Sequence, residues 1–209
     1  MTGFRNILVN IITSLYQTFG ASVVFAILFM LGYWKIKEVG IENTIKNWIS
    51  EFRNNAEFRA WFYLAVYTGM ILFRTLLCRK LWVNPVENVI GVWGLHNNDG
   101  SFSTEIIENC ILFIPWIYLM FSMKGSTISS LGEGVSLLWN ALRFSFSFSL
   151  AIELLQIFLK LGTFQLSDLF FNSLGGLVGG GLYVFKKQII NLNRTSIGDK
   201  YGKEKTKLH

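Results

Sequence analysis

The stretch that decides the fold reads Glu153-Leu-Leu-Gln156, a short break, and then Ser167-Asp168-Leu-Phe-Phe-Asn172-Ser-Leu-Gly175-Gly176, within a strongly apolar part of the chain. An ionised carboxylate near the centre of a membrane helix costs about 2.5 to 3.5 kcal/mol even on a lenient insertion scale, so two such groups need a reason. Glu153 and Gln156 share one helical face, and so do Asp168 and Asn172. Because the connection 160–167 is short, we expect an antiparallel hairpin whose polar pairs converge near its loop end.

The composition places the chain in a membrane. Of its 209 residues, 52% are hydrophobic and only 15% are charged, against roughly 25% charged in soluble domains, and the mean hydropathy is +0.42. The segments apolar and long enough to cross a bilayer are 15–34, 60–77, 106–123, 135–159 and 168–185. The sequence therefore predicts an all-α, polytopic membrane helix bundle with about five transmembrane helices and no separate soluble domain.

The connector between the first two spans has one apolar helical face. Its apolar residues recur at spacings of four, three, one, three and four: Ile41, Ile45, Trp48, Ile49, Phe52 and Ala56. This pattern is typical of an interfacial amphipathic helix that lies flat on the membrane, with a partner-binding helix as the alternative. We accordingly divide the chain into a first span with its connector (1–59), a four-helix membrane domain (60–185) and a basic tail (186–209).

The distribution of Lys and Arg predicts the orientation. The tail carries seven Lys or Arg residues against two acidic ones, which favours a cytoplasmic C-terminus. Five spans would then place the N-terminus outside and the connector inside. Arg74, Arg79 and Lys80 fall on the outer side, where the rule does not expect them. The net charge of +6 comes mostly from the tail, and attraction to anionic lipid together with ordinary orientation signalling explains it without nucleic acid.

Cysteine and histidine usage excludes several kinds of site. The two cysteines, Cys78 and Cys110, allow a single pairing near the outer ends of their spans, although ordinary burial as apolar residues is favoured over a disulfide. His96 and His209 have no ligand at helical spacing, so we expect no metal. No phosphate-binding loop or nucleophile elbow occurs, and we expect no cofactor.

Each polar residue of the hairpin also has a structural interpretation. Ser167 or Asp168 could cap the last helix, and Glu153 could be a neutral carboxyl that hydrogen-bonds Gln156 or Asn172 between helices. Arg143 lies too deep to pair directly with Glu153 and is expected to snorkel inward or find another partner. The last helix also contains two overlapping small-xxx-small pairs, which let neighbouring backbones approach closely: Gly175, Gly176, Gly179, Gly180 and Gly181.

These motifs carry a resemblance. The order Glu-x-x-Gln, a short Gly-containing loop, Asp-x-x-x-Asn and Gly-Gly resembles the VanZ-like family of bacterial membrane proteins, here as Glu153, Gln156, Gly162, Asp168, Asn172, Gly175 and Gly176. Upstream, Asn109-Cys-Ile-Leu-Phe113-Ile-Pro115 is similar to the family's Asn-x-x-x-Phe-x-Pro segment. The resemblance covers roughly 60–185 and leaves the first span, the connector and the tail outside.

The chain also departs from the family pattern. Many members carry Gly-Arg in the hairpin loop where this chain has Gly162-Thr163, so an outward guanidinium is missing, and Arg74, Arg79 or Lys80 are candidates to replace it. The glycine that commonly follows the family proline by two residues is Ile117 here, and Asn84-Pro85 is a loose match to an outer-loop Asn-Pro.

The resemblance implies a multi-pass protein of the bacterial cell membrane. The family takes its name from a protein associated with low-level resistance to teicoplanin, a lipoglycopeptide that acts at the outer cell surface. The implied partner is a membrane lipid, a lipid-linked envelope component or the lipoglycopeptide itself.

Three hypotheses for the function stay open. In the leading one, an outer-facing polar pocket binds or modifies an envelope component. Were it an enzyme, Glu153 would be the general acid or base and Asp168 its ionised partner. Gln156, Asn172, Asn109, Arg74 and Arg79 would then contact the ligand. The second is a proton-coupled transporter, and the third a non-catalytic protein that alters antibiotic access or the assembly of an envelope complex.

Overall fold

In the computed structural model, the described residues are 2–33, 41–77, 81, 83–96, 103–125, 128 and 130–206. The elements are α1 (Thr2–Tyr33), α3 (Ile41–Asn54), α4 (Ala56–Leu72), the π-helix η1 (Phe73–Leu77), α5 (Glu105–Lys124), α6 (Leu131–Leu159) and α7 (Leu166–Thr206). The described part of the chain contains no β-strand, only an isolated bridge between Leu81 and Leu161. The prediction of an all-α fold is confirmed.

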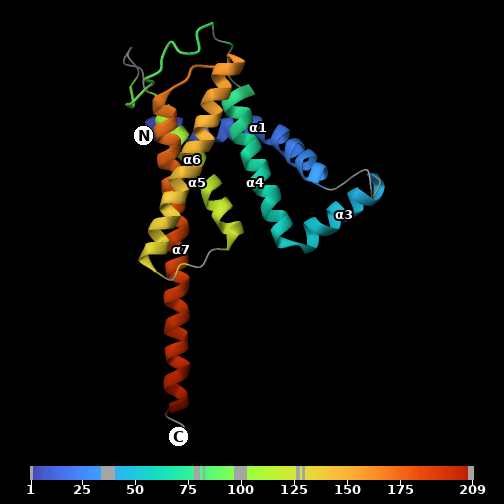
Figure 1. Ribbon diagram of the computed structural model, residues 1–209, viewed down its shortest axis with the longest axis vertical. Coiled ribbons are helices and arrows are strands. Elements are labelled where there is room, and N and C mark those ends of the chain that lie inside the picture. Colours follow the sequence, from blue (N-terminus) through green and yellow to red (C-terminus); the bar gives the residue numbers. More distant parts are fainter. Residues whose placement is uncertain are drawn as a thin grey trace.

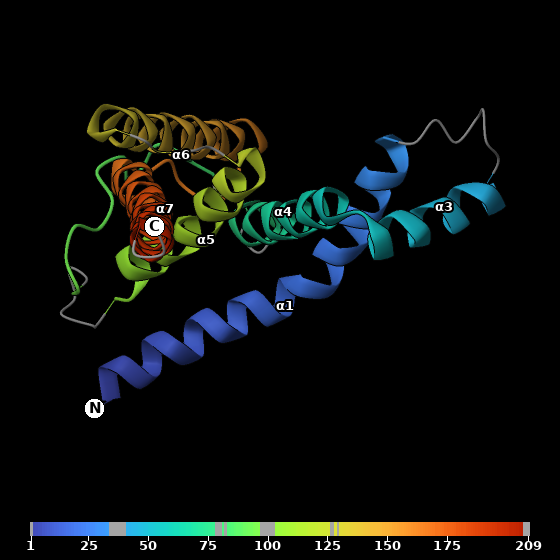
Figure 2. The same ribbon diagram turned by 90° about the horizontal axis from the view of Figure 1, so that it is seen from below.

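Helices suited to a membrane form the body of the protein. Among the described residues, three helices are long and apolar enough to cross a bilayer: Ala56–Leu77, Glu105–Met123 and Leu131–Leu159. The predicted span 168–185 lies within α7, which continues through most of the predicted tail. The apolar part of α1, Tyr16–Leu31, is shorter, and α1 lies across the long axis of the α4–α7 group (Figures 1 and 2). The total of five spans stays a prediction.

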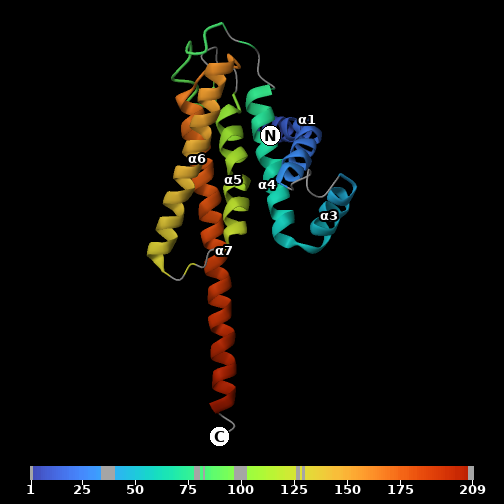
Figure 3. The same ribbon diagram turned by 45° about the vertical axis from the view of Figure 1, so that its right-hand side comes forward.

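Helix α7 packs against both α5 and α6, and these three helices stand side by side in Figure 3. Its glycines divide between the two neighbours. Gly175 and Gly179 face the backbone carbonyls of Cys110 and Ile114 on α5, and a Cβ atom at either glycine would overlap them. On the adjacent face, Gly176 and Gly180 lie against Ser145 and Ala141 of α6. The two predicted small-xxx-small pairs thus serve two different helix interfaces.

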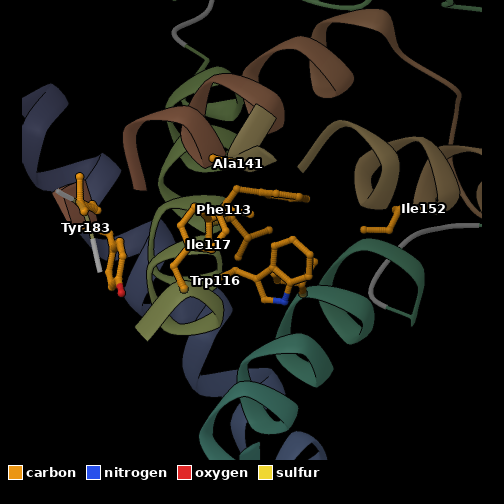
Figure 4. Close-up of a cluster of buried hydrophobic side chains, with 10 residues drawn as sticks. Phe113, Trp116, Ile117, Ala141, Ile152 and Tyr183 are labelled. Atoms are coloured by element: carbon orange, nitrogen blue, oxygen red, sulfur yellow. The ribbon is translucent and has the colours of Figure 1, made fainter. Parts of the chain in front are cut away.

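An apolar core fills the space between α4, α5, α6 and α7 (Figure 4). Phe113 and Ile117 on α5 are completely buried at its centre. Trp116 stacks on Phe148 of α6 with their ring centroids 4.4 Å apart, and its indole N–H donates to Thr68 Oγ1 of α4 at 2.9 Å. This core holds the four helices together and so positions the polar side chains that lie nearer the α6–α7 connection.

The predicted connector is a helix, α3, and it is fixed to α4 by hydrogen bonds. Asn55 Oδ1 accepts from the backbone N–H groups of Glu57 and Phe58, at 2.9 and 3.1 Å, and caps α4. The Arg59 guanidinium donates to the last carbonyls of α3, those of Phe52 (3.0 Å) and Arg53 (2.8 Å).

One part of the apolar face of α3 packs against α4, and the other part is exposed. Trp48 and Phe52 stack on each other and pack against Phe62 of α4. Ile45 and Ile49 are each 49% exposed, as expected for the membrane-facing part of an interfacial helix. Ala56, which the pattern assigned to this face, belongs to α4.

Candidate functional site

The predicted hairpin is present, with α6 and α7 antiparallel. Helix α6 ends at Leu159, and Lys160 takes the left-handed conformation (φ 54°) that closes its last turn. Gly162 at φ 92° turns the chain back, and α7 begins at Leu166. A positive φ strains residues other than glycine, so a glycine at 162 suits this turn.

Glu153 is almost completely buried, with 1% of its surface exposed. Its Oε2 accepts a hydrogen bond from the backbone N–H of Gln165 at 2.9 Å, immediately before α7. The N-terminus of a helix presents free N–H groups and a positive dipole end, so the carboxylate of α6 stabilises the start of α7. Sequence reasoning sought such a contact from Ser167 or Asp168 and did not anticipate Glu153 in this role.

Asp168 lies in the first turn of α7 and is 3% exposed. Its Oδ1 accepts a hydrogen bond from Asn109 Nδ2 of α5 at 2.7 Å. The structure therefore brings together two residues that are 59 positions apart and that belonged to separate motifs. Asn109 therefore contacts Asp168 directly, and this hydrogen bond can orient the Asp168 carboxylate.

The side-chain amides of Gln156 and Asn172 donate hydrogen bonds to different partners. Gln156 Nε2 donates to the backbone carbonyl of Thr75 in η1 at 2.8 Å, and Asn172 Nδ2 donates to Ser149 Oγ of α6 at 2.9 Å. Gln156 Oε1 and Asn172 Oδ1 are buried and accept no hydrogen bond from the described part of the chain. A π-helix is rare and is often found at functional sites, and here it supplies the carbonyl that Gln156 reaches.

The cluster formed by Glu153, Gln156, Asp168 and Asn172 is buried, each member being at most 4% exposed. We call it the polar cluster. The outer-facing pocket that the sequence suggested stays a prediction, because the structure places these side chains inside the helix group.

A loop at residues 83–96 covers the end of the hairpin, and Figure 1 draws it at the same end of the molecule as the α6–α7 connection. The backbone N–H groups of Phe164 and Leu166 donate to the carbonyls of Pro85 and Val89, at 2.9 and 2.8 Å. Gly91, at φ 76°, lies so close to Ser167 that a Cβ atom would overlap it. Trp93 packs on the ring of Phe170 with centroids 5.3 Å apart. The loop is thus held to the hairpin by its backbone and by one indole ring.

Arg74 has a protein partner that sequence reasoning missed. Its guanidinium forms an ion pair with Glu108 of α5, whose carboxylate also accepts from Thr104 Oγ1. Asn10 Nδ2 of α1 donates to the same Thr104 hydroxyl at 3.2 Å. A Glu108–Arg74 pairing between adjacent helices was readable in principle, because both charges were expected near the outer ends of neighbouring spans.

The remaining predicted residues lie at the edge of the site or outside the described part. Thr163, which stands where many family members have Arg, is buried and accepts a hydrogen bond from Gln165 Nε2 at 3.0 Å. Its side chain thus serves the loop internally. Arg79, Lys80 and Cys78 lie outside the described residues. Cys110 is a free, half-buried cysteine on α5.

Comparison with known proteins agrees with the hairpin motifs. The sequence profile of the VanZ/LLP1 family matches residues 6–187. This chain belongs to the VanZ/LLP1 family. The protein is therefore a VanZ-like membrane protein of a family linked to glycopeptide resistance.

The match is wider than the sequence motifs suggested. The resemblance expected over 60–185 extends from residue 6, so it takes in α1 and the connector helix α3 as well. No curated protein and no solved structure matched the chain.

Proposed function

We propose that this VanZ-like protein binds the polar part of a cell-envelope lipid or lipid-linked component at the polar cluster, and that this binding reduces the action of glycopeptides. The observation that carries the proposal is the pair of buried acceptors, Gln156 Oε1 and Asn172 Oδ1, which the described residues leave without a donor. A buried polar group without a partner costs about 1–3 kcal/mol. A hydroxyl- or amide-bearing ligand, directly or through a water, would supply the missing donors.

The surroundings of these acceptors support a ligand that carries donors. Glu153 is one helical turn from Gln156 on α6, and Asp168 is one turn from Asn172 on α7, so two buried carboxyl groups add acceptors to the same helix faces. The seven basic residues of the tail favour a cytoplasmic C-terminus, which would put the hairpin loop, and hence the cluster, near the outer surface. Envelope components with sugar or peptide groups at that surface fit such a site.

The loop at 83–96 would control entry. It contacts the hairpin through two backbone hydrogen bonds, the close approach of Gly91 to Ser167 and the Trp93 ring. Lifting it would open the outer end of the cluster without separating the helices. In the bound state it would close over the ligand and exclude water.

The experiment compares teicoplanin susceptibility of cells that produce the full-length variants at equal membrane levels. Asn172→Leu and Glu153→Gln should each abolish the protection given by the wild type, because each removes an acceptor from the cluster. Phe158→Leu is the matched control, since Phe158 follows Gln156 on α6 but is 82% exposed. Full protection by Asn172→Leu at wild-type abundance would overturn the proposal.

Mass spectrometry of envelope lipids and precursors then separates binding from modification. Cells with and without the intact protein should contain the same lipid species if the protein only binds. A species that appears or disappears with the protein, and that depends on Glu153, would assign a chemical role to the carboxylates. The susceptibility result and the lipid profile are independent readouts.

A further inference from the structure

A groove lies between α6, α7 and the loop at 83–96, on a face of α7 different from that of Asp168 and Asn172. Its volume is about 560 Å³, and it is partly open to the surroundings of the protein. Trp93 of the loop and Trp139 of α6 both line the groove. The other lining side chains are nearly all apolar and come from both helices: Leu142, Phe146, Leu166, Leu169 and Phe170.

One cation interrupts this apolar lining. Arg143 of α6 borders the groove, is exposed, and forms no hydrogen bond or ion pair with the described part of the chain. It lies twelve residues after Leu131, the first residue of α6, which is about 18 Å along the helix axis. Helix α6 is about 43 Å long, against about 30 Å for the hydrocarbon core of a bilayer, so a core centred on the helix places the Arg143 backbone about 12 Å inside its edge.

An isolated guanidinium at this depth is unfavourable unless an anion reaches it. Side chains on a helix lean toward its N-terminus, so Arg143 extends toward the end of α6 that the basic tail predicts to be cytoplasmic. Anionic phospholipids are the abundant anions on that side of a membrane. A guanidinium binds phosphate through two parallel hydrogen bonds, which holds a lipid in one position better than a single point charge does.

We propose that this groove is a binding site for an anionic phospholipid, with the phosphate on Arg143 and one acyl chain along the apolar lining toward Trp93. The charge of Arg143 selects the head group, and the apolar walls accept the chain. Aromatic rings at Trp139 and Trp93 border the two parts of the site. The proposal does not depend on the polar cluster, because the groove could hold a lipid whether or not the cluster holds a ligand.

The test uses the purified full-length protein in mixed micelles and the quenching of its tryptophan fluorescence by lipids brominated on their acyl chains. Brominated phosphatidylglycerol should quench more strongly than brominated phosphatidylcholine at equal mole fraction, because only the first carries net negative charge. Arg143→Gln should remove the difference between the two lipids, and Arg143→Lys should keep part of it. Circular dichroism checks that each variant is folded.

A competition experiment on the wild type tests the groove itself. Unlabelled long-chain phosphatidylglycerol should displace the brominated lipid, and the dihexanoyl form should displace it much less, because its chains are too short to fill the groove. Equal displacement by both forms would mean that Arg143 contacts head groups only, and would overturn the proposed chain site. Equal quenching by the two brominated lipids would overturn the proposal even if Arg143→Gln failed to fold.

Discussion

Gly175→Ala should separate α7 from α5. A Cβ atom at this position would lie 2.8 Å from the carbonyl carbon of Cys110 and 3.0 Å from its Cα, and it would overlap the carbonyl oxygen. Carbon atoms pack favourably at about 3.5–4.0 Å, so the two backbones would have to move apart by roughly 0.5–1 Å. The obstacle is backbone, which cannot rotate away as a flexible side chain can.

The size of the effect follows from two opposing contributions. Overpacking of this kind costs typically about 1–3 kcal/mol. Replacing Gly by Ala within a helix gains up to about 1 kcal/mol, because Ala loses less backbone entropy. Gly181→Ala is the matched control, since Gly181 lies on the same helix and a Cβ atom there would meet nothing within 4 Å.

Unfolding of the purified full-length protein in mixed micelles, followed by circular dichroism, measures both variants. Gly181→Ala should match or exceed the wild type. Gly175→Ala should be less stable than Gly181→Ala by about 1–3 kcal/mol, because the propensity gain is common to both and cancels in the difference. Indistinguishable free energies of unfolding for the two variants would refute the close approach of α5 and α7.

The same unfolding assay tests three contacts elsewhere. Asn109→Leu should lower stability by about 1–3 kcal/mol by depriving buried Asp168 of a donor, and a neutral result would argue against that bond. A double-mutant cycle of Arg74→Met and Glu108→Leu should give a coupling of about 0.5–3 kcal/mol, whereas additive effects would contradict the ion pair. Asn55→Ala should cost about 1 kcal/mol through loss of the α4 cap, and no change would exclude that role.

Local patterns predicted the helical fold and the hairpin. Alternation of polar and apolar residues at helical spacing marked α3, and glycines four apart marked the two close faces of α7. Such features depend on residues within one or two helical turns of each other, so a single sequence contains them in full.

The pairing of the polar residues could not be predicted in the same way. Gln156 donates to a carbonyl of the π-helix, and neither the irregular turn nor its position is visible in the residue types of 73–77. Glu153 Oε2 accepts a hydrogen bond from the backbone N–H of Gln165, a contact that the sequence did not indicate. Every residue other than proline has a backbone N–H and a backbone carbonyl, so the residue type does not indicate which of these groups a side chain will bind.

The arrangement of α1 was also beyond the sequence. Its apolar residues predicted a span over 15–34, whereas the helix lies across the α4–α7 group and packs on α4, with Ser22 and Phe25 against Gly69. Hydropathy measures how apolar a segment is, and it contains no information on the angle at which that segment meets its neighbours.

The position of α7 after α5 and α6 in the chain has a consequence for biosynthesis. Asn109 and Ser149 belong to α5 and α6, which leave the ribosome before the residues that they bind on α7. Until α7 inserts, their polar groups lack those partners in a medium without water. Insertion of α7 therefore supplies these partners, and a chain shortened before Leu166 should be recognised by membrane proteases as unassembled.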